Sequence, residues 1–141
     1  MAREAVVIEL YGQNNSGDGR RFYVPDNVSI AKGTLCLITN APGSSGRVAS
    51  EALVYTTSIR PAGIASMDKT ANDGSTSITL WTNGIFNIYT SGALTIGDKV
   101  KLASSNYVIA EGDTTNSAAL TFGVALKTVS TNEVVPVRIN L

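Results

Sequence analysis

The stretch PAGIASMDKTANDGSTSITLWTNGIFNIYTSGALTIGDKVKL, residues 61–102, decides the fold class of this chain. It places short runs of alternating apolar and polar residues between turn-forming Gly, Asn, Asp and Ser. In residues 77–82, for example, Ile78 and Leu80 share one face of an expected strand. Such runs are typical of short β-strands joined by tight turns.

Asn83-Gly84 separates this run from a second β-like run, IFNIYT, at residues 85–90. The type I′ turn of a two-residue hairpin needs positive φ at both central residues, and Asn-Gly tolerates this well. The sequence therefore predicts a β-hairpin that turns at Asn83-Gly84. A β-branched residue in place of Gly84 is expected to damage this turn.

The same reasoning predicts strands along the rest of the chain, with Pro61 and Pro136 at a strand start, an edge or a bulge. The further expected strands are residues 5–11, 21–24, 34–39, 59–66, 99–104, 107–110, 120–127 and 133–141. Residues 47–54 are the best candidate for a short helix, although residues 52–57 would equally suit a strand. The pattern predicts an all-β fold with little helix: a small β-barrel, a β-tulip-like domain or a sandwich.

Residues 30–37 and 94–102 echo each other, because both run from apolar residues through a turn glycine into an alternating strand. Any two strands that follow glycine turns look alike in this way. We interpret the echo as ordinary turn chemistry, since a single short match does not establish a repeat.

Length and charge limit the classes of function. The 141 residues predict one domain. Lys and Arg total 11, Asp and Glu total 11, and the net charge is zero, which argues against a nucleic-acid binder or a polybasic membrane binder. The N-terminal residues do not read as a signal peptide, and no apolar run approaches the ~20 residues of a membrane span. We expect a soluble protein made in the cytosol.

Catalytic machinery is not apparent. The chain has no histidine and a single cysteine, so His-dependent catalysis, a cysteine zinc site and an internal disulfide are excluded. Cys36 is expected to be a core residue. Asp68 and Asp73 could form a carboxylate pair, but Asp73-Gly74 reads as a turn and Asp68-Lys69 as a solvated loop. We predict no enzyme activity, no catalytic residue, no cofactor and no metal.

Two groups of aromatic residues are candidates for binding. Residues 20–23, RRFY, form the basic-aromatic cluster of the chain, and a partner contact or an ordinary strand entry explains it better than nucleic-acid binding. Trp81, Tyr89 and Tyr107 could offer a sugar platform, although their spacing does not single one out.

The N-terminal strand AVVIELY, residues 5–11, is apolar on both faces and is followed by a loop rich in Gly and Asn. We divide the chain into an N-terminal arm and loop, residues 1–27, and a single β domain, residues 28–141. Such a strand can pair with a sheet edge of another chain or inside its own domain, and both alternatives stand. The expected partner-contact residues are Val6, Ile8, Leu10, Tyr11, Arg20, Arg21, Phe22 and Tyr23.

Several glycine turns and apolar strand positions resemble the capsid decoration (cement) proteins of tailed bacteriophages. The resemblance covers roughly residues 28–141. Its best-matching parts are PAGIA at 61–65, GIF at 84–86, residues 93–100 with the turn Gly97-Asp98, FGVAL at 122–126 and VVPVRINL at 134–141.

The resemblance implies a structural virion protein on the outer surface of the phage capsid. Such a protein would bridge neighbouring major capsid subunits, as a homotrimer at threefold or local threefold positions, without nucleic acid, membrane or small-molecule substrate. No active-site residue is carried over. Residues 1–27 look longer than the usual start of the family, and we expect them to reach a neighbouring subunit or the shell. The alternative is a carbohydrate- or receptor-binding β module of a head fibre.

Overall fold

The computed structural model describes residues 4–10, 19–38, 49–51, 60–103, 106–111 and 121–141. These residues contain strands and no α-helix, which confirms the predicted all-β class. In this part of the chain no helix is long and apolar enough to cross a membrane. The strands are β1 (Val6–Glu9), β2 (Gly19–Tyr23), β3 (Leu35–Ile38), β4 (Ala49–Glu51), β5 (Arg60–Ala65), β6 (Ser77–Trp81), β7 (Asn83–Tyr89), β8 (Lys99–Leu102), β9 (Val108–Ala110), β10 (Thr121–Ala125) and β11 (Val134–Asn140).

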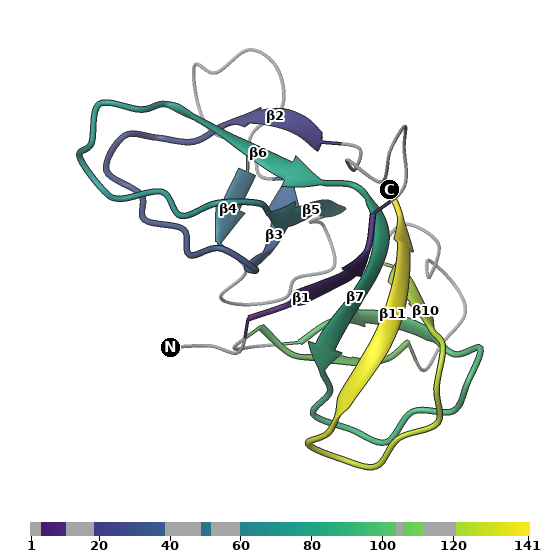
Figure 1. Cartoon of the computed structure of the whole chain (residues 1–141). Helices are drawn as coiled ribbons and strands as arrows, with labels where there is room; N and C mark the ends of the chain where they lie inside the picture. The colour runs from purple at the N-terminus through teal and green to yellow at the C-terminus, as the bar shows by residue number, and fades with distance from the viewer. Residues whose placement is uncertain (1–3, 11–18, 39–48, 52–59, 104–105, 112–120) are drawn as a thin grey trace.

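The strands form two sheets in which all pairings between named strands are antiparallel (Figure 1). The six-stranded sheet has the order β1-β7-β11-β10-β8-β9, and the five-stranded sheet has the order β2-β6-β5-β3-β4. The helix expected at residues 47–54 is wrong where the structure describes it, because Ala49–Glu51 pairs with β3 as a strand. The remainder of that range lies outside the described residues.

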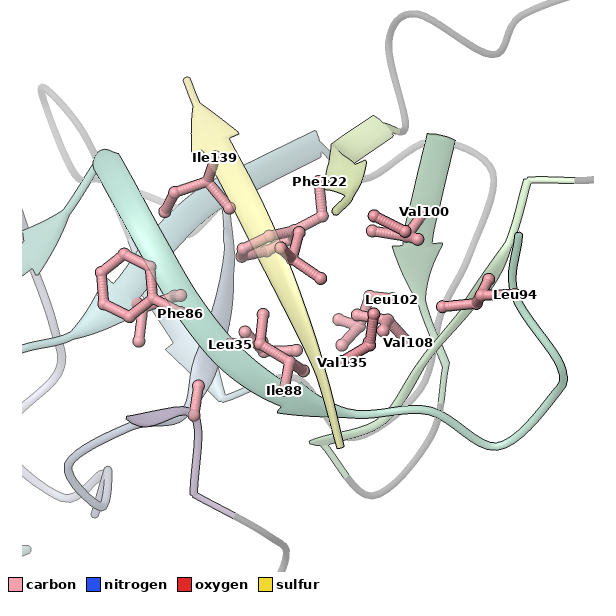
Figure 2. Packing of buried hydrophobic residues seen from close by; sticks show 14 of the residues in the cluster. Leu35, Phe86, Ile88, Leu94, Val100, Leu102, Val108, Phe122, Val135 and Ile139 are labelled. Atoms are coloured by element: carbon pink, nitrogen blue, oxygen red, sulfur yellow. The ribbon is translucent and has the colours of Figure 1, made fainter. Parts of the chain in front are cut away.

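The larger hydrophobic cluster joins the two sheets. Figure 2 shows Leu35 of the five-stranded sheet among side chains of the six-stranded sheet, including Phe86 and Phe122, and all three are almost fully buried. A second cluster lies within the five-stranded sheet, with side chains of β2, β3, β5 and β6, and includes Cys36, which is fully buried as expected. Alternation explains this packing, because every second residue of β7 and β11 faces the core.

The hairpin predicted at Asn83-Gly84 is wrong. β6 pairs with β2 and β5, whereas β7 pairs with β1 and β11, and the chain passes from one sheet into the other through Thr82. Asn83 and Gly84 lie inside β7, opposite Asn140 and Ile139 of β11. The turn preference of Asn-Gly does not determine the conformation here, because pairing of β7 with β1 and β11 keeps the segment extended.

The strand order reveals an internal repeat. β2-β6-β5-β3-β4 in one sheet and β7-β11-β10-β8-β9 in the other are the same topology, so residues 19–81 and 83–140 form two equivalent units. Isolated bridges repeat as well: Ile30 exchanges two backbone hydrogen bonds with Lys69, and Leu94 exchanges two with Val129. Our interpretation of the sequence echo as mere turn chemistry is therefore wrong.

The ends of the two units meet at one place. β6 continues directly into β7, and the C-terminus ends beside this junction (Figure 1). Leu141 donates its backbone N–H to the carbonyl of Thr82 at 2.8 Å, and Gly19 at the start of β2 lies opposite Trp81. The end of β11 thus leads toward the start of β2, as β6 leads into β7. Among the described strands, β1 has no counterpart in this arrangement.

Candidate interaction surface

The N-terminal segment is fastened at a glycine turn of the first unit. Ala5 is buried and donates its backbone N–H to the carbonyl of Gly33 at 2.9 Å. Gly33 has φ +79°, and a Cβ there would lie 2.1 Å from Cγ of Glu4 and 2.9 Å from the carbonyl oxygen of Ala5. Only glycine allows the segment to lie this close.

β1 then forms the outer edge of the six-stranded sheet. Val6 lies opposite Asn87 and Glu9 lies opposite Ile85, with a register irregularity between Val7 and Glu9. All four residues of β1 are exposed, including Val6 and Ile8 at 51% each. An edge strand with apolar side chains on its surface is able to pair with a further strand.

The structure distributes the predicted contact residues over two sheet edges. Val6 and Ile8 are exposed on β1, and Leu10 packs partly against the core. Val7, which the prediction omitted, is 44% exposed. Tyr11 lies outside the described residues.

The remaining predicted contact residues lie on β2. Arg20, Arg21 and Tyr23 are exposed, with Tyr23 at 37%. Phe22 is 4% exposed and belongs to the second core cluster, so it does not contribute to the surface. β1 and β2 are edges of different sheets, and the structure does not pair them with each other.

The orientation of β2 follows from its ladder with β6. Val24 donates its backbone N–H to the carbonyl of Thr76. Because hydrogen-bonded and non-hydrogen-bonded pairs alternate in an antiparallel ladder, the backbone groups of Arg21 and Tyr23 point away from β6. No strand in the described part of the chain pairs with this outer side of β2.

The two candidate catalytic carboxylates have structural partners. Asp68 accepts the backbone N–H of Lys32 at 2.7 Å. Asp73 accepts the backbone N–H of Ser75 at 2.8 Å and the ammonium of Lys69 at 3.2 Å. These two hydrogen bonds, that from Ser75 above all, hold the pKa of Asp73 below its usual value. Both carboxylates therefore shape loops.

Lys69 is a further residue whose environment differs from the prediction. It was expected in a solvated loop but is 4% exposed, at the position equivalent to Val129 of the second unit. Its Nζ also donates to the carbonyls of Asp26 and Thr70, each at 3.2 Å. A buried ammonium needs such partners, and only recognition of the repeat would have revealed its core position.

The candidate sugar-binding aromatics are engaged with other side chains. Trp81 is half-buried against the larger core cluster. Tyr89 and Tyr107 contact each other edge to face, with ring centroids 6.3 Å apart. Among the described residues, no three His, Cys, Asp or Glu side chains lie close enough together to hold a metal ion.

Comparisons with known proteins identify a family and a similar fold. A family model described as phage cement protein matches residues 24–141. The solved structure of the head fibre gp8.5 N base in bacteriophage phi29 is similar in fold, with a TM-score of 0.55 and 15% sequence identity. That match covers 87% of this chain and 93% of the other. No curated protein matches the sequence.

Proposed function

The chain belongs to the phage cement protein family, and we propose that it binds the outer surface of an assembled phage capsid and stabilises the shell. Membership of this family supports a structural role in the virion rather than an enzymatic one. The observation that carries the proposal is the family match over residues 24–141, which spans most of both structural units.

The finer proposal is that the protein bridges neighbouring major capsid subunits as a homotrimer. Its partners would then be the major capsid protein and further copies of itself. Individual contacts need not be strong, because a trimer that holds one subunit presents its other contacts at high effective concentration. We also propose that residues 1–27 supply the contacting segment and that residues 28–141 carry it, although β2 within the first range packs into the first unit through Phe22 and Val24.

The exposed edge at β1 supports this role of the N-terminal segment. Val6, Val7 and Ile8 place apolar side chains in solvent, and among the described strands β1 has β7 as its one neighbour. Backbone pairing along such an edge gives affinity, while alternate side chains give specificity. Contact with the shell would remove these side chains from water.

The proposal is tested by binding the purified protein to capsid shells that lack it, followed by sedimentation of the shells. Ile8→Asp is expected to weaken binding at least tenfold, because it places a charge in the proposed apolar contact. Met67→Asp is the matched control, since Met67 is 52% exposed and Ile8 is 51% exposed. Wild-type protein that does not sediment with the shells would refute the proposed function.

Deletion of residues 1–11 separates assembly from folding. The segment buries Ala5 and part of Leu10 and pairs with β7, so its loss should cost about 3 kcal/mol of folding stability. Shell binding and trimer formation should fall much further. A shortened protein that forms trimers and binds shells as the full chain does would contradict the role of the arm. Sedimentation velocity measures the oligomeric state.

A further inference from the structure

The internal repeat identifies a second strand-docking site. The N-terminal segment touches the first unit at Gly33 and the second unit along β7. The shared topology of the two units relates Gly33 to Gly97, and the outer edge of β7 to that of β2. We propose that Gly97 and the outer edge of β2 bind an extended segment of the capsid protein, a conclusion that rests on the proposed function for the identity of the partner.

Gly33 and Gly97 are equivalent in their backbone bonding. Gly33 donates its N–H to Ala65 at 2.9 Å, and Gly97 donates to Ala125 at 2.8 Å. Both have positive φ, +79° and +92°. They differ in what covers them: a Cβ at Gly33 would collide with the N-terminal segment, whereas a Cβ at Gly97 would meet no atom within 4 Å.

β7 and β2 are equivalent as acceptor strands. Thr90 donates to Glu133 after β7 just as Val24 donates to Thr76 after β2, which makes Asn87 the counterpart of Arg21. Asn87 lies opposite Val6 of β1 and is half-buried. Arg21 is exposed, and its backbone groups face outward.

The side chains around the second site suit an apolar and acidic strand. Ile96, next to Gly97, is 63% exposed, so it offers an apolar contact. Arg21 offers a positive charge at the strand edge. The segment that fills the first site has a small residue, Ala5, over the glycine. Its acidic residue Glu9 lies opposite Ile85, two positions from Asn87, the counterpart of Arg21, so an acidic residue at the same place would be a diagonal neighbour of Arg21. An extended segment of the same chemistry would therefore fit the second site.

The number of sites indicates that the occupant belongs to another protein. Within the described residues, each chain has one segment that fills such a site and two equivalent acceptor sites, so in an assembly of this chain this segment alone leaves half of the sites unfilled. Exchange of arms between copies would fill one site by emptying another. Under the proposed function, the capsid protein is the chain that supplies the additional strand.

The site is tested with a fluorescent peptide of residues 1–11, MAREAVVIELY, as the probe, titrated with full-length protein in an anisotropy assay. The wild type should bind the peptide saturably. Gly97→Asn fills the space over the glycine while preserving the turn, because Asn tolerates positive φ and this chain already has Asn at φ 60–66°. It should weaken binding at least tenfold. Gly74→Asn is the control, since Gly74 also has positive φ and open space around it.

A second pair of variants tests the strand edge independently of the turn. Arg21→Glu should weaken peptide binding at least fivefold and make it less sensitive to salt, since it replaces the attracting charge. Arg138→Glu is the control, because Arg138 is an exposed arginine in the central part of the other sheet. The site would be overturned if the wild type did not bind the peptide. It would also be overturned if Gly97→Asn and Arg21→Glu bound the peptide as tightly as the wild type does.

The same variants, assayed on capsid shells, identify the occupant. Loss of shell binding in Gly97→Asn but not in Gly74→Asn supports a capsid strand at the second site. If Gly97→Asn binds shells normally and instead loses self-association, the occupant is a second copy of this chain, and the capsid assignment is overturned. If the wild-type protein binds the peptide but does not bind shells, the site is supported and the proposed function is refuted.

Discussion

Substitution of Gly123 by alanine tests the close approach on which the second unit depends. A Cβ at Gly123 would lie 2.5 Å from the carbonyl oxygen of Arg138 and 2.7 Å from Cγ1 of Val137. Leu126 donates to the carbonyl of Pro136 two positions along the ladder. By alternation, Arg138 is therefore hydrogen-bonded to Val124, its register partner. The added methyl group must push this paired carbonyl aside.

The cost follows from the bonds and contacts that have to move. Loss of two ladder hydrogen bonds costs about 1 kcal/mol each, and overpacking costs about 1 kcal/mol more. Alanine also reduces the entropy of the unfolded chain, which stabilises the folded state by about 0.5–1 kcal/mol. The net loss is about 2 kcal/mol. For 141 residues, an unfolding entropy of ~0.3 kcal/mol/K converts this into a fall in Tm of about 7 °C.

Thermal unfolding followed by circular dichroism measures this change. Gly92→Ala is the matched control, because no atom lies within 4 Å of its added Cβ, and its Tm should stay constant or rise slightly. A Tm for Gly123→Ala within about 2 °C of wild type would refute the argument that the methyl group displaces the Arg138 carbonyl.

Three further predictions concern the arm, the buried lysine loop and the contact between the sheets. Gly84→Val should release the N-terminal strand, because a Cβ at Gly84 would lie 2.6 Å from the carbonyl oxygen of Glu9; faster proteolysis near the N-terminus would show this, and unchanged cleavage would contradict it. Asp73→Asn should make the free energy of unfolding, measured with urea, fall less steeply as the pH is lowered into the acid range. Because the pKa of Asp73 is lowered, its contribution to folding stability is present above the usual pKa of 3.8 and is lost as the pH falls below it. An equal loss of stability at acid pH in the wild type and the variant would contradict this role of Asp73. Asn106→Ala should cost about 2–4 kcal/mol, since Asn106 has φ +66° and its side chain accepts the N–H of Leu35 at 2.7 Å; an unchanged urea midpoint would refute that role.

The strands were predictable from the sequence because their signals are local. Alternation along β6 and β11 identifies their buried faces, and both faces are buried as the pattern indicates. The turn at Gly97-Asp98 is equally local. The choice of strand partners is not local, since it depends on which segments meet in space.

Asn83-Gly84 illustrates the limit of a local signal. The dipeptide is suited to a hairpin, but Gly84 is required here because the backbone of Glu9 passes close by. The residues next to Gly84 in the sequence do not indicate that the backbone of Glu9 lies close to it. Likewise, nothing adjacent to Lys69 marks it as buried, because its partners Asp26 and Asp73 come from the turns that it holds together.

The repeat was difficult to recognise because equivalent positions share a backbone requirement rather than a side chain. Gly63 and Gly123 are glycines at equivalent positions, because a Cβ at either one would collide with a backbone carbonyl of the next strand. Lys69 and Val129 are equivalent in position but opposite in polarity. The two units therefore share a strand topology and differ in the side chains at equivalent positions. The N-terminal strand occupies one of the two equivalent places, at Gly33 and β7. In the described part of the chain no strand pairs with the outer edge of β2 at Arg21, so the two places differ in occupation although their backbones are alike.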